Sequence, residues 1–316
     1  MYNIQDKDIV IFHIGGSLGD YGPIVKTVQT FPNNCIVFVF EARSEASSIE
    51  QYNDKGTRVV IVNECIGKAI EERDFYVNKY PESSSLFPTN PKAAKEHILP
   101  FVSPNDIRTW GENTVLDHII KVNTTTIKDF IDKNDIIPDI LSIDAQGAEL
   151  EIMLGVGDYF RDIITVVSEV EFLEIYLGQC LFHHQFDFLT KQDFRLVDIF
   201  HQQMWSKGPE YGKGFLVAGE ALWFKDICNL EMYKTIKLAA ISYSFDRFSY
   251  TYTLLKKLIE VDKDQVVNIF NQFGYEKLLS IVDMIDNNLE NYRIDKYFFI
   301  NKYFEEGKSI HDKNSI

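Results

Sequence analysis

The sequence has no apolar run of the length that a membrane-spanning helix requires. Hydrophobic residues make up 45% of its 316 residues, yet no uninterrupted run approaches the ~20 residues that cross a bilayer. Residues 1–8 contain no basic stretch that leads into an apolar segment, and the run Ile9–Ile14 is too short for a signal peptide. We therefore expect a globular protein of the cytoplasm with no membrane span.

Cysteine and positive charge are also scarce. The four cysteines, Cys35, Cys65, Cys180 and Cys228, are widely separated, unlike the paired cysteines of disulfide frameworks and metal sites, so we expect buried thiols in a reducing compartment. The net charge is −15, from 32 basic and 47 acidic residues, which opposes binding to a phosphate backbone. We expect no nucleic-acid partner and attribute the acidity to solubility.

Short, continuous apolar runs fill the first two thirds of the chain, as in strands that are buried on both faces. Strands are predicted at residues 9–14, 35–41, 58–63, 138–144, 163–170 and 194–200, and a run at 214–224 is predicted to close the sheet antiparallel. Helices are predicted at residues 21–30, 44–54 and 124–131. This alternation predicts an α/β fold with a Rossmann-like, doubly wound, mostly parallel sheet of six or seven strands.

Two segments depart from this pattern. Residues 71–115 are polar and contain five prolines, so we expect a long loop with small local elements, whose Phe101 and Trp110 shape or cover an acceptor pocket. From residue 226 onward, apolar residues recur at helical spacing without any β-rich run. We therefore divide the chain into a sheet domain, residues 1–225, and a helical C-terminal extension, residues 226–316.

The segment His13-Ile-Gly-Gly-Ser-Leu-Gly-Asp20 joins the first strand to a helix. Glycines there let backbone N–H groups approach a ligand, and a helix N-terminus favours an anionic group. The dinucleotide pattern G-x-G-x-x-G has Ile14 at its first position here, which disfavours NAD. Glu41 ends the second strand, at the place where an acid meets a ribose in nucleoside-binding Rossmann sites. The alternatives are a purely structural turn and a solvated charge at Glu41.

The most specific pattern is Asp139-Ile-Leu-Ser-Ile-Asp-Ala-Gln-Gly-Ala-Glu-Leu-Glu-Ile-Met-Leu-Gly155, followed by Ser168-Glu-Val-Glu-Phe-Leu-Glu-Ile-Tyr-Leu-Gly178. Here the chain resembles the FkbM-type methyltransferase family, which carries an I-D-x-Q/E-G-A-E-L-E strand end and then an E-V-x-F segment. The resemblance covers roughly residues 8–225 and includes Ser83–Leu86, Thr124–Phe130 and Gly219–Phe224. It implies a class I methyltransferase fold and S-adenosylmethionine-dependent O-methylation, commonly of sugar or polyketide hydroxyls.

Ligands of doubly wound sheets bind beyond the carboxyl ends of the strands, which fixes the expected cofactor site. Contacts to the methionine part are predicted for His13, Gly15, Gly16, Ser17, Gly19 and Asp20. We assign Glu41 to the ribose, Asn63 or Glu64 to the adenine, and Asp144 with Gln146 to the same crevice. The family usually has an Asp and a Gly-Ala-Asn turn where this chain has His13 and Gly15-Gly16-Ser17. Asp20 is one substitute for that acid, and a packed core histidine is the alternative role of His13.

Methyl transfer to a hydroxyl needs the oxygen held in line with the S–CH3 bond and a base for its proton. The catalytic candidates are Asp144 and Glu149, then Glu169 and Glu171, which share one face of a strand, and His183. Glu149 as a helix cap and His183 as a surface residue are the structural alternatives. No compact cluster of ligands appears in the sequence, so no metal is predicted. The expected partner is a small-molecule or glycan hydroxyl acceptor, and a homo-oligomer is left open.

Two other functions stay open from the sequence. The altered glycine turn keeps a cofactor-less Rossmann-like scaffold in a glycan-assembly complex as the alternative. An NAD-dependent oxidoreductase comes third, because Ile14 and the Asp144–Glu149 block both count against it.

Overall fold

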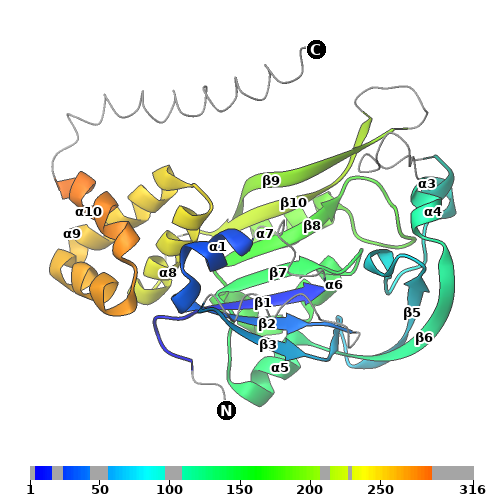
Figure 1. The fold of residues 1–316 in the computed structure, drawn as a ribbon, viewed down its shortest axis with the longest axis horizontal. Coiled ribbons are helices and arrows are strands. Elements are labelled where there is room, and N and C mark those ends of the chain that lie inside the picture. Colours follow the sequence, from blue (N-terminus) through cyan, green and yellow to red (C-terminus); the bar gives the residue numbers. More distant parts are fainter. Residues whose placement is uncertain are drawn as a thin grey trace.

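The computed structural model describes residues 4–15, 24–42, 56–96, 109–206, 214–226 and 230–286. They form an α/β fold around a seven-stranded sheet of order β3-β2-β1-β7-β8-β10-β9, with a three-stranded sheet of order β4-β6-β5 beside it (Figure 1). The predicted fold class, a doubly wound and mostly parallel Rossmann-like sheet with C-terminal helices, is confirmed.

The seven strands of the large sheet match the seven predicted runs. They are β1 (Ile9–Gly15), β2 (Cys35–Phe40), β3 (Arg58–Val62), β7 (Ile140–Asp144), β8 (Thr165–Glu171), β9 (Phe194–Trp205) and β10 (Phe215–Lys225). The first five are parallel, and β10 runs antiparallel to both β8 and β9. The strand order reverses between β1 and β7, which makes the carboxyl ends of these two strands the topological switch point.

Alternate residues of each strand enter two separate hydrophobic layers, which explains the continuous apolar runs. Ile9 and Ile11 of β1 pack in one layer with helices from both ends of the chain, and Val10 and Phe12 pack in the other. The first layer is covered by α1 (Val25–Thr30), α8 (Met232–Ser244), α9 (Phe248–Phe273) and α10 (Leu279–Asp286). The second is covered by α5 (Ile127–Asn134), α6 (Glu149–Leu154) and α7 (Phe182–Lys191).

The predicted long loop at residues 71–115 is wrong in its first part. β5 (Glu71–Asn78) pairs antiparallel with β6 (Leu116–Thr125), and β4 (Cys65–Ile66) pairs parallel with β6. Most side chains of β5 and β6 are exposed or half-buried, so no apolar run marks these strands in the sequence. Among the described residues between them, the local elements are a 3-10 helix (Pro81–Ser83) and the short helices α3 (Pro91–Glu96) and α4 (Trp110–Asn113).

Two predicted helices need adjustment. The helix predicted at residues 124–131 is α5, which begins at Ile127 because Thr126 caps it by accepting a hydrogen bond from the Asp129 N–H. The helix predicted at residues 21–30 is described only from α1 onward. The helix predicted at 44–54 lies outside the described residues.

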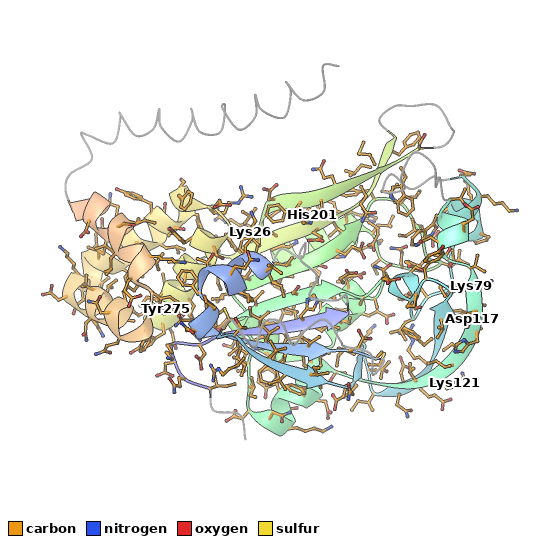
Figure 2. The ribbon with its side chains drawn as sticks, viewed as in Figure 1. Lys26, Lys79, Asp117, Lys121, His201 and Tyr275 are labelled. Atoms are coloured by element: carbon orange, nitrogen blue, oxygen red, sulfur yellow. The ribbon has the colours of Figure 1, made fainter. Side chains whose placement is uncertain are left out.

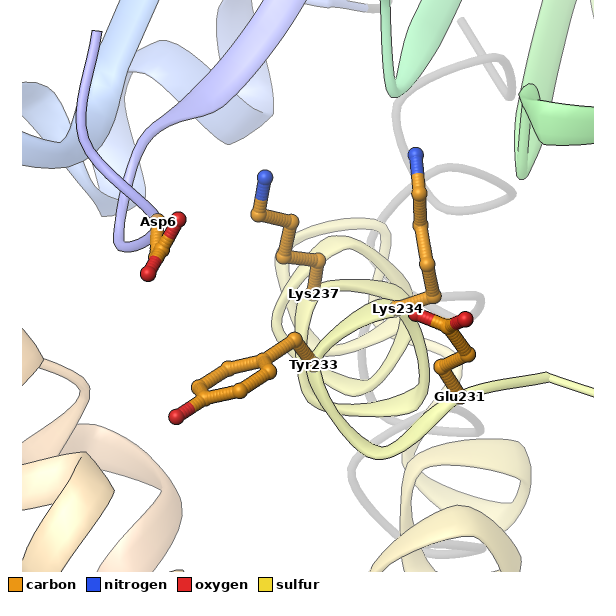
Figure 3. Close-up of a pocket in the computed structure, with 5 residues that line it drawn as sticks. All are labelled: Asp6, Glu231, Tyr233, Lys234 and Lys237. Carbon is orange, nitrogen blue, oxygen red and sulfur yellow. The ribbon is translucent and has the colours of Figure 1, made fainter.

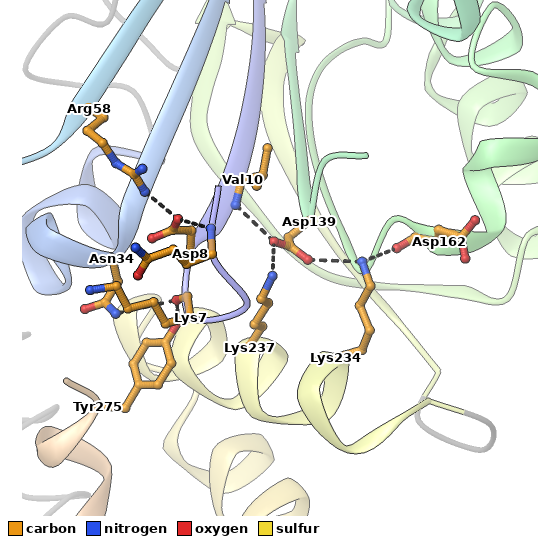
Figure 4. Close-up of polar contacts among 11 residues, drawn as sticks. Lys7, Asp8, Val10, Asn34, Arg58, Asp139, Asp162, Lys234, Lys237 and Tyr275 are labelled. Carbon is orange, nitrogen blue, oxygen red and sulfur yellow. Dashed lines mark hydrogen bonds and ion pairs between the residues drawn. The ribbon is translucent and has the colours of Figure 1, made fainter. Parts of the chain in front are cut away.

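The predicted helical character after residue 226 is confirmed for residues 230–286. These helices share a hydrophobic layer with the sheet, and Tyr275 is fully buried there (Figure 2). Its hydroxyl donates to the Lys7 carbonyl at 2.7 Å (Figure 4). Whether residues 226–316 form a separate unit stays a prediction. Within the described ranges, no helix combines the length and apolarity needed to cross a membrane.

Asp139, at the start of the β7 segment, ties α8 to the sheet (Figure 4). Its carboxylate is buried and accepts hydrogen bonds from the Val10 N–H at 2.9 Å, Lys237 at 2.9 Å and Lys234 at 3.1 Å. Burial alone would raise the pKa of Asp139, but the two lysines lower it below its ordinary value. Both lysines also line a polar cavity with Asp6, Glu231 and Tyr233 (Figure 3).

Asp139→Ala is expected to lower the free energy of unfolding by about 3 kcal/mol, because it leaves two partly buried ammonium groups without their partner. Urea unfolding followed by circular dichroism measures this change. Asp187→Ala is the control, since it removes only an exposed ion pair with Lys191 that is worth about 0.3–0.5 kcal/mol. Equal losses in the two variants would contradict the assignment.

Candidate functional site

The carboxyl ends of β1, β2, β3 and β7 bring most of the predicted cofactor residues to one edge of the sheet. Gly15 ends β1 and pairs in register with Asp144 at the end of β7. Glu41 follows β2 and donates its backbone N–H to the Val62 carbonyl at 3.0 Å, which fixes it between the ends of β2 and β3. Asn63 and Glu64 directly follow β3, the first exposed and the second half-buried.

Gly15 cannot be replaced without moving the backbone at the switch point. Its φ is +68°, and a Cβ built on it would lie 2.0 Å from the backbone oxygen of Asp144. Glycine is therefore required there for both conformation and space. The other predicted residues of this turn, Gly16, Ser17, Gly19 and Asp20, lie outside the described residues.

His13 lies two residues before Gly15 on β1, inside the sheet. It is only 6% exposed, and its Nδ1 is 3.0 Å from the hydroxyl oxygen of Ser142, its register partner on β7. The structure thus places His13 in the core with a polar partner on the neighbouring strand.

The D-A-Q-G-A-E sequence forms a tight turn between β7 and α6. Gln146 and Gly147 have positive φ values of 52° and 100°. The fully buried Glu149 closes the turn, since its Oε1 accepts hydrogen bonds from the backbone N–H groups of Ala145 at 2.9 Å and Gly147 at 3.0 Å. Oε1 of Glu149 therefore stabilises the turn, which is the structural role that the sequence left open. Oε2 takes no part in these hydrogen bonds.

Gln146 connects the turn to three other segments. Its Nε2 donates to Asp144 at 2.9 Å and to Glu169 at 3.1 Å, and so holds these two carboxylates together. Its Oε1 accepts from the hydroxyl of Tyr176 at 2.8 Å, and its backbone carbonyl accepts from Ser85 at 2.6 Å. The Ser83–Leu86 and Ser168–Gly178 motifs thus meet at this one residue.

Four of the five catalytic candidates gather at this edge. Asp144 and Glu169 are joined by Gln146, and Glu149, Glu169 and Glu171 each place a carboxylate oxygen within 4.8 Å of the other two. Glu149 and Glu171 are fully buried, and none of the four forms an ion pair with a Lys or Arg of the described residues. The fifth candidate, His183, is exposed on α7, where its ring lies 3.8 Å from that of His184.

Burial raises the pKa values of the three glutamates, and repulsion from their acidic neighbours adds to the effect. The pKa of Glu149 is raised to about 7, chiefly by burial and further by Asp144. The pKa values of Glu169 and Glu171 are raised well above their ordinary range by burial and by their acidic neighbours. The site therefore favours protons or a cation.

Glu220 is a site residue that the sequence reasoning missed. It lies directly opposite Glu169 in the antiparallel β8–β10 ladder, so both side chains occupy the same face. Its Oε2 is 3.3 Å from Nδ1 of His201. Burial raises the pKa of Glu220 to about 7 against the opposing effect of His201. The signal available in the sequence was a single acid inside the apolar run of β10.

Trp110 packs against the loop that follows β8. It is buried, donates its indole N–H to the Ile175 carbonyl at 3.2 Å, and lies edge-on to Tyr176 with ring centroids 5.6 Å apart. The polar segment thus covers the loop after β8, and the part of Trp110 in an acceptor pocket stays a prediction. Phe101 lies outside the described residues.

The mostly parallel seven-stranded sheet with its helices is consistent with a Rossmann-like methyltransferase fold. The family model of the methyltransferase FkbM domain matches residues 16–196, more than half of the chain, and the protein belongs to this family. The resemblance found in the sequence is therefore confirmed. No curated protein and no solved structure is significantly similar to the chain.

The raised pKa of Glu149 predicts that the fold loses stability as the pH rises from 4.5, the ordinary glutamate value, toward 7. The unfolded chain releases this proton at the lower pH and the folded chain only near the higher one, so the contribution, on the order of 3 kcal/mol, is present below this window and lost across it. Urea unfolding midpoints, measured in the presence of a metal chelator across this pH window, test the predicted loss of stability. Glu149→Gln should flatten the dependence and the exposed Glu72→Gln should not; identical slopes in all three proteins would refute it.

Proposed function

We propose that this FkbM-family protein transfers a methyl group from S-adenosylmethionine to a hydroxyl oxygen of a sugar or glycan-type small molecule. The observation that carries the proposal is the meeting of the Gly15 turn with the Asp144 cluster at the switch point. Family membership supports methyl transfer in general. The donor and the acceptor class belong to the proposal.

The described residues fit a nucleoside sulfonium. At Gly15, a Cβ would occupy the space against the Asp144 carbonyl, so backbone can approach a ligand closely there. Glu41, held at the end of β2, is assigned to the ribose hydroxyls, and Asn63 or Glu64 to the adenine. The cofactor supplies a methyl group activated by positive sulfur, a charge that the nearby carboxylates favour.

The acid cluster supplies the groups that an acceptor hydroxyl needs. Asp144 is half-buried at the strand end and oriented by Gln146, which suits it to accept the hydroxyl proton. Glu169, held by the same amide, lies beside it. Glu220 and His201 form a second acid–base pair on the neighbouring strands. Positioning supplies much of the acceleration in such a transfer. The main contribution of this hydrogen-bonded network is therefore to hold the reacting groups in place.

The same proposal places the reaction in the cytoplasm. Cys35, Cys65 and Cys180 are free thiols, which fits a reducing compartment. Cys228 lies outside the described residues.

Calorimetric titration with S-adenosylmethionine is expected to show binding, and Glu41→Ala is expected to weaken it by about tenfold or more, since a hydrogen bond to a charged group contributes about 1.5–3 kcal/mol. The exposed Glu72→Ala is the matched control and should bind as the wild type does. Absence of heat at millimolar cofactor would contradict the proposal and favour the cofactor-less scaffold.

Asp144→Asn should lower turnover by about a hundredfold, because it removes a base but keeps the oxygen that accepts the hydrogen bond from Gln146. A mass-spectrometric screen for the gain of one methyl group, across glycans and nucleotide sugars, identifies the acceptor on which turnover is measured. Unchanged kinetics in this variant would remove Asp144 from the catalytic role.

A further inference from the structure

We propose that Glu149, Glu169 and Glu171 bind a hard divalent cation of the Mg²⁺, Mn²⁺ or Ca²⁺ class. The sequence predicted no metal because its carboxylates are distributed over two separate elements. The fold brings the first residue of α6 together with two residues of β8. Carboxylate oxygens are the preferred ligands of these ions.

The spacing of the three carboxylates suits one ion. A ligand oxygen from each lies within 4.8 Å of the other two. Two oxygens on opposite sides of a bound ion are separated by about 4.2 Å for Mg²⁺ and by about 4.6–5.2 Å for Ca²⁺, twice the metal–oxygen distance. All three side chains therefore reach a common centre with small movements.

A second observation is that buried oxygens of this cluster have no hydrogen-bond partner within the described residues. Glu171 is 0% exposed, and neither of its oxygens has a hydrogen-bond partner within the described parts of the chain. The side-chain amide of Gln179 lies near it, but its nitrogen does not complete a hydrogen bond. Oε2 of Glu149 is equally buried and unbonded. Buried polar groups are normally satisfied, so three unbonded oxygens on two carboxylates of one cluster indicate a missing partner.

The surrounding contacts hold the ligands without using their free oxygens. Two backbone N–H groups fix Oε1 of Glu149 and leave Oε2 for the ion. Gln146 donates to Oε2 of Glu169 and sets its orientation. Such outer contacts are typical of metal sites, where they orient the ligands.

Shared protons are the competing way to neutralise this cluster. A proton neutralises one carboxylate or a pair that shares it, whereas a cation would be contacted by all three carboxylates at once. Under the proposed function, such an ion would lie close to Asp144 and offer a position for an acceptor oxygen. The cation site itself stands independently of that function.

The test is direct cation binding by the full chain after removal of metals with chelator. Titration with Mn²⁺, followed by electron paramagnetic resonance, should show one saturable site per chain, and Mg²⁺ or Ca²⁺ should compete for it. Saturation should also raise the melting temperature. Glu171→Gln should weaken binding by more than about tenfold, since loss of even an outer-shell contact costs that much.

The matched control is Glu72→Gln, the same substitution at an exposed acid of β5, which should bind as the wild type does. Glu169→Gln is a second ligand variant in case Glu171→Gln does not fold. No saturable Mn²⁺ binding, or equal binding by the ligand variants and the wild type, would overturn the site and leave shared protons. Calorimetry with S-adenosylmethionine on the same samples keeps the two proposals apart, since either ligand can bind while the other fails.

Discussion

The close approach of β1 to β7 at Gly15 is the constraint on which the rest of the site depends. Because Gly15 has no side chain, its backbone lies against the Asp144 carbonyl, and the parallel pairing continues to the last residue of both strands. The glycine-rich turn and the acidic turn therefore begin from the same point in space. Any larger residue at this position would separate the ends of β1 and β7, from which the two turns start.

The acids at the two ends of the β7 segment have opposite electrostatic surroundings. Asp139 has two lysines and a backbone N–H, which keep it charged and fasten α8 to the sheet. At the other end, Asp144 adjoins three glutamates that lack any such counter-ion among the described residues. One end of the strand thus adds stability, and the other holds electrostatic strain that a ligand can relieve.

The sequence predicted the large sheet well because most of its strands are continuous apolar runs that are covered on both faces. β5 and β6 escaped prediction because most of their side chains face water, so hydrogen bonding in the ladder, not burial, defines them. Glu169 and Glu171 were found through their two-residue spacing on one strand. Glu220 joins them only through the antiparallel register of β10, a long-range pairing that no local pattern reports.

The family match ends at residue 196, yet β10 begins at Phe215 and forms the sheet partner of β8. A protein cut at the limit of the match would leave β8 as an open edge, with unpaired backbone groups and an exposed apolar surface where Leu222 and Trp223 had packed. Glu220, which lies opposite Glu169 in the ladder, would also be lost. The smallest piece of this chain able to fold and act therefore extends beyond its recognisable family segment.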